Sequence, residues 1–399
     1  MVCPAPRTVL VPICVTSPDF SCRAHFYQIF VKITIIKRYL YIVIAIYTDG
    51  LIEIRKLQKV GAATLTVSLP KRWVLKKGLK PGDIVTLIEN EDGSLRLDVG
   101  EAKKAENTIF TINYDLCNSN RMLSRLIIGA YLQGADVIKI ISNNALTTDT
   151  VNEIQATVDR LPGLEITEQT YRMVTIQSFI DPSKFPIEVM LKRLQILVAS
   201  MLNQVVSSIS EGTPVNISEI TRQESKVDEL YFLTIRQIFL ALRKWHLSMA
   251  LGIDSPIYAA GVRLVAKALE DMGDIIESIA KGLNSIYKPP LKISPEIAKK
   301  LEELGMTIQT LFSKTMKALL NLDADLLNDI LNNISYVLEQ QDRLTDDVLL
   351  TVNGERLASS LKTVIWGFMC IVRNCEVIAE VAFNRLTRTT SNIISIEKA

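Results

Sequence analysis

The sequence predicts a multidomain, mainly α-helical protein: a small β module, a small α/β connector and two C-terminal three-helix bundles. Three observations indicate this fold class. A chain of 399 residues is long enough for two to four domains. Short runs of alternating apolar and polar residues fill residues 51–100 and recur between helical stretches over residues 107–181. Beyond Pro186 the apolar residues recur with the 3.6-residue period of helices.

The composition argues against several classes of function. The chain has 45 basic and 43 acidic residues, a net charge of +2, so any surface for nucleic acid must be local. His25 and His246 are too few for His-rich metal sites and argue against a Ser-His-Asp hydrolase. The six cysteines form no CxxC pair, which is typical of a reducing, cytoplasmic location. Cys370 and Cys375 lie in an apolar helical stretch and are expected to be packed thiols.

Residues 1–50 differ from the rest of the chain. Their apolar run over residues 39–47 is shorter than the roughly 20 helical residues that span a bilayer, and the basic residues lie too deep for a signal peptide. We therefore expect no stable membrane insertion. We expect this segment to be a doubtful N-terminal extension translated from a mis-chosen start, with the chain proper opening near Leu51 or Ile52. A floppy or weakly membrane-associated tail is the alternative.

Residues 51–100 predict four strands and one helix with a strongly basic surface. The strands are expected over 51–58, 63–69, 83–89 and 94–99, the helix over 70–77, and Asp92-Gly93 is a hairpin turn signal. Between Glu53 and Lys80 there are eight basic residues and one acidic residue, a local net charge of +7, where phosphates could bind. An ordinary solvated basic face is the alternative. So short a module buries little apolar surface alone, so we expect a dimer to complete its core.

A family resemblance favours the DNA-binding interpretation. It rests on the stretch from Arg55 to Trp73, on Gly78-Leu-Lys-Pro-Gly-Asp-Ile-Val85 and on Asp92-Gly-Ser-Leu95. Together these segments resemble AbrB/MazE/SpoVT-type swapped-hairpin DNA-binding domains, in which two chains intertwine into one small barrel. The resemblance implies a homodimer that binds DNA through five basic residues: Arg55, Lys56, Lys59, Lys71 and Arg72.

Residues 107–181 predict a small α/β connector with the order β-α-β-α-β-β. The expected strands are 108–112, 137–141, 165–170 and 173–179, and the expected helices are 121–133 and 148–160. This order suggests that the helices cover one face of the sheet. The segment contains neither a phosphate loop nor a catalytic cluster. We expect it to act in spacing or dimer contact, with ligand sensing as the alternative.

The helical region divides into two sets of three helices, residues 184–288 and 291–388, around Pro289-Pro290. Short connections between neighbours predict an antiparallel three-helix bundle in each set. The expected helices are 186–210, 217–251, 257–286, 295–320, 324–350 and 355–386.

Two pairs of acidic residues at four-residue spacing mark the first set. Glu224 and Asp228 lie on one predicted helix, Glu270 and Asp274 on the next, so the four carboxylates can converge. Oxygen-only ligands suit Mg²⁺ or Ca²⁺, or iron and manganese bound through bridging carboxylates. The alternative is a solvated face in which acids on the second helix pair with basic residues of the same stripe, namely Arg263, Lys267 and Lys281.

The segments Glu224–Leu230 and Leu269–Ala280 resemble the paired E/D-x-x-x-D motifs of PhoU domains, and the resemblance spans residues 184–386. It implies that each three-helix bundle can hold a surface metal cluster. The first-bundle ligands would be Glu224, Asp228, Glu270 and Asp274. In the second bundle one motif has lost its leading carboxylate at Val372, which leaves four weaker candidates: Asp342, Asp346, Glu376 and Glu380.

The order of the parts resembles archaeal PhoU-like phosphate uptake regulators. It implies a non-enzymatic DNA-binding regulator of phosphate uptake and phosphate homeostasis, in which the bundles sense a state or a partner. The alternative is a transporter-docking adaptor that modulates a phosphate ABC permease without sequence-specific DNA binding. A metal-dependent hydrolase is a third interpretation, but the sequence lacks an obvious nucleophile or general base for it.

Overall fold

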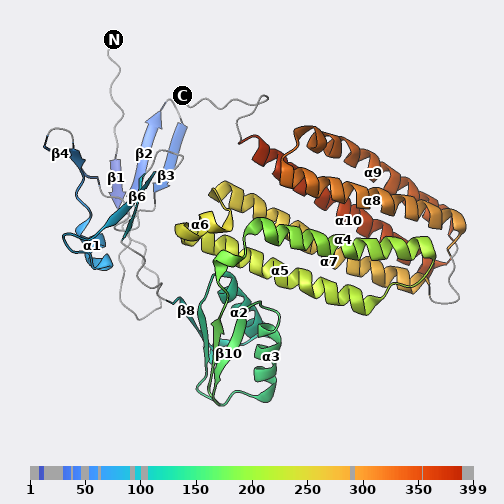
Figure 1. Cartoon of the computed structure of the whole chain (residues 1–399), viewed down its shortest axis with the longest axis horizontal. Coiled ribbons are helices and arrows are strands. Elements are labelled where there is room, and N and C mark those ends of the chain that lie inside the picture. The colour runs from blue at the N-terminus through green and yellow to red at the C-terminus, as the bar shows by residue number, and fades with distance from the viewer. Residues whose placement is uncertain are drawn as a thin grey trace, which may run out of the picture. The chain divides into compact units, whose positions relative to one another are not determined.

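The chain divides into two compact units, residues 1–105 and 106–399. The computed structural model in Figure 1 describes residues 9–12, 30–36, 39–45, 54–61, 64–89, 95–99, 107–287, 293–352 and 354–388.

The first unit contains seven short strands and one helix among its described residues. An antiparallel sheet has the order β1-β2-β3, with β1 at Val9–Pro12, β2 at Phe30–Ile36 and β3 at Tyr39–Ala45. The expectation that the chain proper opens near Leu51 stays a prediction. The remaining elements are β4 (Gln58–Val60), β5 (Thr64–Thr66), α1 (Lys71–Lys77), β6 (Val85–Glu89) and β7 (Leu95–Val99).

Residues 54–99, here called the basic head, form two antiparallel hairpins, β4–β5 and β6–β7, with α1 between them. The strand predicted over residues 51–58 was wrong in position, because the hairpin pairs Gln58 with Thr66 and leaves residues 54–57 irregular. Gly61 allows this close turn, since its φ of 67° lies in the left-handed region that favours glycine. The Asp92-Gly93 turn lies outside the described residues.

The connector, residues 107–181, is a four-stranded sheet covered by two helices. Its sheet order is β10-β11-β9-β8; β8 and β9 are parallel and the other pairs are antiparallel. Alternate strand residues such as Ile138, Ile140 and Ile176 are buried in one core with Ile127 and Ile154 of the helices. The elements are β8 (Ile109–Asn113), α2 (Met122–Leu132), β9 (Val137–Ile141), α3 (Thr148–Val158), β10 (Leu164–Gln169) and β11 (Met173–Ser178).

Seven helices follow the connector among the described residues. Four of them begin at a residue whose side chain accepts a hydrogen bond from a backbone N–H of the first turn: Asn216, Ser255, Ser294 and Asp323. The first bundle comprises α4 (Ile187–Glu211), α5 (Ile217–Arg243), α6 (Trp245–Leu251) and α7 (Pro256–Ile286). The second bundle comprises α8 (Pro295–Asn321), α9 (Ala324–Thr351) and α10 (Glu355–Leu386). The Pro289-Pro290 divider lies outside the described residues.

The helix predicted over residues 217–251 was wrong in one respect, because it breaks at Lys244 into α5 and α6. Arg243, the last residue of α5, donates a hydrogen bond to the carbonyl oxygen of Gln133 in the connector. The change of direction brings Leu251 and Ile253 into the bundle core, where both are buried. A continuous helix would carry these apolar side chains past the core.

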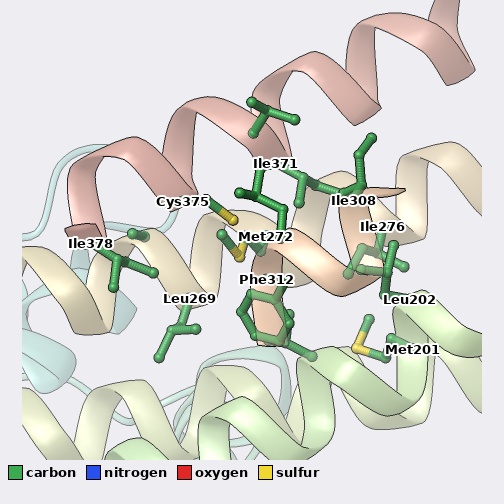
Figure 2. Close-up of a cluster of buried hydrophobic side chains, with 14 of the residues drawn as sticks. Met201, Leu202, Leu269, Met272, Ile276, Ile308, Phe312, Ile371, Cys375 and Ile378 are labelled. Atoms are coloured by element: carbon green, nitrogen blue, oxygen red, sulfur yellow. The ribbon is translucent and has the colours of Figure 1, made fainter. Parts of the chain in front are cut away.

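The two bundles share one continuous hydrophobic core. Helix α7 packs along α10, and α4 packs along α8. Figure 2 shows side chains from these four helices in contact across the junction. The labelled residues, all buried, are Met201, Leu202, Leu269, Met272, Ile276, Ile308, Phe312, Ile371, Cys375 and Ile378. Because so much apolar surface leaves water at the junction, the bundles stabilise one another.

Helices α7 and α10 approach closely at Gly367. A Cβ added there would lie 2.8 Å from Ile279 Cδ1 and closer still to Cγ1. Ile279 is fully buried, so a shift of its side chain would disturb the surrounding core. We expect Gly367→Ala to lower the free energy of unfolding by about 1–3 kcal/mol through overpacking, as measured by chemical denaturation.

Gly129→Ala in α2 is the matched control, because an added Cβ there meets nothing within 4 Å. It should raise the free energy of unfolding by up to about 1 kcal/mol, as helix propensity predicts. If Gly367→Ala gave the same gain as Gly129→Ala, α7 and α10 could not pack as closely as the structure places them.

Two stretches of the described chain, Ile187–Glu211 and Leu247–Ile286, are long and apolar enough to cross a membrane by length and composition alone. Both supply buried residues to the shared core of the bundles. Core helices pass the same test, so this finding is weak evidence for a membrane span.

Candidate functional site

Three carboxylates from two neighbouring helices of the first bundle come together. Glu224 and Asp228 lie one turn apart on α5, and Asp274 lies on α7. One oxygen of each lies within 4.8 Å of the others. Glu224 and Asp228 are partly buried and Asp274 is exposed, so the group opens to solvent.

A second group of carboxylates adjoins the first. Glu270 and Asp271 meet the same 4.8 Å limit with Asp274, which therefore belongs to both groups. We call these five residues the acidic cluster. The structure thus brings Glu270 next to Asp274, as the sequence predicts, but places it in a different group from Glu224 and Asp228.

Two lysines neutralise part of this face. Lys267 pairs with Glu270 and with Asp271, in the second case at 2.8 Å between Nζ and Oδ1. Lys281 pairs with Glu277 at 2.6 Å. Glu270, Asp271 and Glu277 are therefore paired with lysines of their own helix, as the alternative of a self-neutralised face predicts. Arg263 instead lies over the ring of Phe239, at 5.4 Å from its centroid.

The trio of Glu224, Asp228 and Asp274 receives one cation among the described residues. Arg160 of the connector donates to Asp228, with 2.7 Å between Nη2 and Oδ2. Within the described part of the chain, neither Glu224 nor Asp274 has a basic side chain at ion-pair distance.

The pKa values of three acids in the cluster are raised, first by burial and then by neighbouring negative charge. Burial, followed by the charges of Asp228 and Asp274, raises the pKa of Glu224 to about 7. Burial of its carboxylate and the charge of Asp228 also raise the pKa of Asp274. The pKa of Glu270 rises to about 6 because burial outweighs the opposing effect of Lys267. At neutral pH these acids would be stabilised by an added cation.

The donor set fits a hard metal ion. All five side chains offer carboxylate oxygen, the ligand that Mg²⁺, Ca²⁺, Mn²⁺ and iron accept. Three carboxylates with a single ion-pair partner among the described residues, Arg160 on Asp228, give such an ion an electrostatic reason to bind. Glu224, Asp228 and Asp274 would hold one ion, and Asp274 would also face an ion held by Glu270 and Asp271.

We expect Glu224→Gln to stabilise the metal-free protein above pH 7. The pKa of Glu224 is raised from 4.5 to about 7 in the folded state, so its charge opposes folding as pH rises through this range. Unfolding in the presence of a chelator should show Glu224→Gln more stable than wild type by about 1 kcal/mol at pH 8, after discounting for solvent screening, and no more stable at pH 4.5.

Glu219→Gln, on the same helix, is the control with the opposite sign. Hydrogen bonds from Arg222 and Gln223 lower the pKa of Glu219 to about 2, so its charge favours folding above pH 4.5 and this contribution is lost as pH falls toward 2. At pH 8 this variant should be less stable than wild type. If both variants were more stable than wild type at pH 8, the opposite pKa shifts assigned to Glu224 and Glu219 would be contradicted.

The basic head presents its predicted DNA-contact residues to solvent. Residues 54–60 include β4 and carry three of them, and the first turn of α1 carries the other two. The side chains are all exposed: Arg55, Lys56, Lys59, Lys71 and Arg72.

The same head exposes large apolar side chains. A single chain leaves Leu65, Leu75, Ile84 and Leu87 each at least 60% exposed. Four large apolar side chains exposed within so short a module favour an interaction surface over an ordinary one. Within the described part of the head, one chain leaves these side chains uncovered.

Comparison with known families identifies both regions. The family model "PhoU domain" matches residues 191–283, which contain the acidic cluster. The family model "Antidote-toxin recognition MazE, bacterial antitoxin" matches residues 58–107, which contain most of the basic head. The chain joins a MazE-type domain to a PhoU domain. No curated protein matches the chain.

The PhoU match covers the first bundle and stops before the second. In the second bundle Asp342 and Asp346 lie on α9, and Glu376 and Glu380 lie on α10. Among the residues that the structure describes, these four form no group of three close carboxylates. Glu376 instead accepts a hydrogen bond from Arg373 at 2.8 Å. The weaker metal candidates are therefore not brought together as the PhoU-domain carboxylates are.

Sequence reasoning missed two residues of the PhoU-domain site. Asp271 lies directly after Glu270, outside the four-residue spacing that selected the other acids, although the adjacent acidic pair was a visible signal. Arg160 comes from the connector, 68 residues before its partner Asp228. No periodicity within a single helix could indicate that contact.

Proposed function

We propose that the protein is a cytoplasmic DNA-binding regulator of phosphate uptake and phosphate homeostasis. The observation that carries the proposal is the presence, in one chain, of a basic MazE-type head and a PhoU domain with a carboxylate cluster. Both families are regulatory rather than catalytic. The PhoU domain supplies the link to phosphate, and the head supplies the means to act at DNA.

The head works as a homodimer in this proposal. Its exposed Leu65, Leu75, Ile84 and Leu87 would be covered by a second copy, and burial of apolar surface stabilises by about 25 cal/mol per Å². Pairing also doubles the number of exposed basic side chains that face one duplex. Affinity for phosphates rises with the number of such contacts.

The acidic cluster senses state by binding a divalent or iron-type cation. The bound ion would supply positive charge between α5 and α7, while Glu224, Asp228 and Asp274 hold it and Lys267 keeps Glu270 and Asp271 oriented. The bundles would then offer a metal-dependent surface to a partner, for which a phosphate ABC transporter component is the candidate.

Genome-wide capture of DNA bound to the native protein, under phosphate-rich and phosphate-poor growth, tests the proposal. Enrichment near phosphate transporter genes that changes with phosphate supply supports a DNA-binding regulator. Recovery of DNA at random, together with copurification of a phosphate permease, would instead support the transporter-docking adaptor.

A further inference from the structure

One ion pair connects the connector to the PhoU-domain site. Arg160 follows the C-terminal end of α3, and its Nη2 lies 2.7 Å from Asp228 Oδ2 on α5. The Asp228 side chain is 16% exposed and that of Arg160 is 58% exposed. The guanidinium also lies over the ring of Phe232, at 5.9 Å from its centroid. Arg160 therefore reaches from a solvent-facing position onto a largely covered carboxylate.

Arg160 pairs with a carboxylate that would also bind a metal ion, that of Asp228. Among the described residues it is the one basic side chain at ion-pair distance from the trio of Glu224, Asp228 and Asp274, while Lys267 and Lys281 pair with other acids. A divalent ion held by Asp228 would lie a few ångströms from the guanidinium and repel it. The same carboxylate cannot neutralise both cations fully.

The connector has a separate anchor on the same helix. Arg236 of α5 is buried and donates hydrogen bonds to the carbonyl oxygens of Tyr131 and Ala135, at 2.6 and 2.9 Å. Gly134 packs against Leu240 one turn further along. The contact at Arg160 can therefore open while the connector stays attached at Arg236.

We propose that Arg160 is a built-in competitor for the PhoU-domain metal site, so that metal binding at Asp228 releases the end of α3. This inference rests on the proposed metal function of the acidic cluster. Coupling between two binding events is reciprocal, so closing the Arg160 contact must weaken metal binding as much as metal binding opens the contact. Binding of the metal would thereby change how the connector contacts the PhoU domain. In the chain the connector lies between the PhoU domain and the basic head.

Calorimetric titration of the full-length protein with Mn²⁺ tests the competition. Arg160→Gln should bind Mn²⁺ about tenfold more tightly than wild type, within the usual range of such couplings. Arg125→Gln, which removes an exposed charge from α2 of the same connector, should bind like wild type. Weaker binding by Arg160→Gln would show that Arg160 orients Asp228 as a ligand. Weaker or unchanged binding would overturn the proposal.

Hydrogen exchange over residues 155–163 gives a second readout that does not depend on affinity. Mn²⁺ should speed exchange there in wild type and leave Arg160→Gln unchanged, because its contact is already open. Equal Mn²⁺ effects in both proteins would overturn the proposal while leaving the metal site intact. If Asp274→Asn bound Mn²⁺ like wild type, the metal site itself would fail, and the competition would fail with it.

Discussion

Replacing Arg55 and Arg72 together by alanine should weaken binding of the full-length protein to duplex DNA by about 10- to 100-fold. Both side chains are exposed on the basic head, and each lost phosphate contact lowers the slope of log affinity against log salt by about 0.9. The proposed dimer would present each position twice, so the slope should fall markedly. Fluorescence anisotropy with a labelled duplex, from about 50 to 200 mM salt, measures both effects.

The matched control removes two basic residues from the second bundle. Arg356 and Lys362 lie exposed on α10, and replacing both by alanine changes the net charge by the same amount. This control should keep the affinity and the salt dependence of the wild type. If the two double variants lost the same affinity, binding would follow net charge and not the head.

Asp274→Asn should abolish the stabilisation that a bound metal ion gives. Asp274 belongs to both groups of the acidic cluster, so this one change removes a ligand from each. At a Mn²⁺ concentration of about 100 times Kd, the wild type should gain about 2.7 kcal/mol in the free energy of unfolding, and the variant almost nothing. Denaturant unfolding with and without Mn²⁺ measures this difference.

Asp325→Asn serves as the control for the metal effect, because Asp325 is an exposed acid in the first turn of α9, outside the acidic cluster. It should show the same Mn²⁺ gain as the wild type. A full Mn²⁺ gain in Asp274→Asn would mean that the ion binds elsewhere on the protein.

Local sequence patterns predicted the helices and the connector strands well, because the bounds of such elements are set by residues close together in the sequence. The strand predicted over residues 137–141 matches β9, and the helix predicted over residues 295–320 matches α8 to within one residue. Apolar periodicity and capping side chains such as Ser294 set these bounds. The paired acids on α5 and α7 were predictable for the same reason, since four-residue spacing fixes a shared face.

Contacts between distant segments could not be predicted in this way. The apolar stripe of α7 indicated burial but not that α10 of the second bundle would cover it, so the shared core at Ile279 and Gly367 was missed. Arg160 was missed because its role depends on the docking of the connector onto α5. The break at Lys244 likewise serves packing beyond its own helix.

Sedimentation equilibrium of the full-length protein with a fluorescent duplex tests most directly whether two basic heads bind DNA as a dimer. At low ionic strength the fluorescent species should have the mass of one duplex plus two protein chains, and this complex should dissociate as the salt concentration is raised. A duplex that carries one chain, or that sediments alone at low ionic strength, would contradict the proposed regulator.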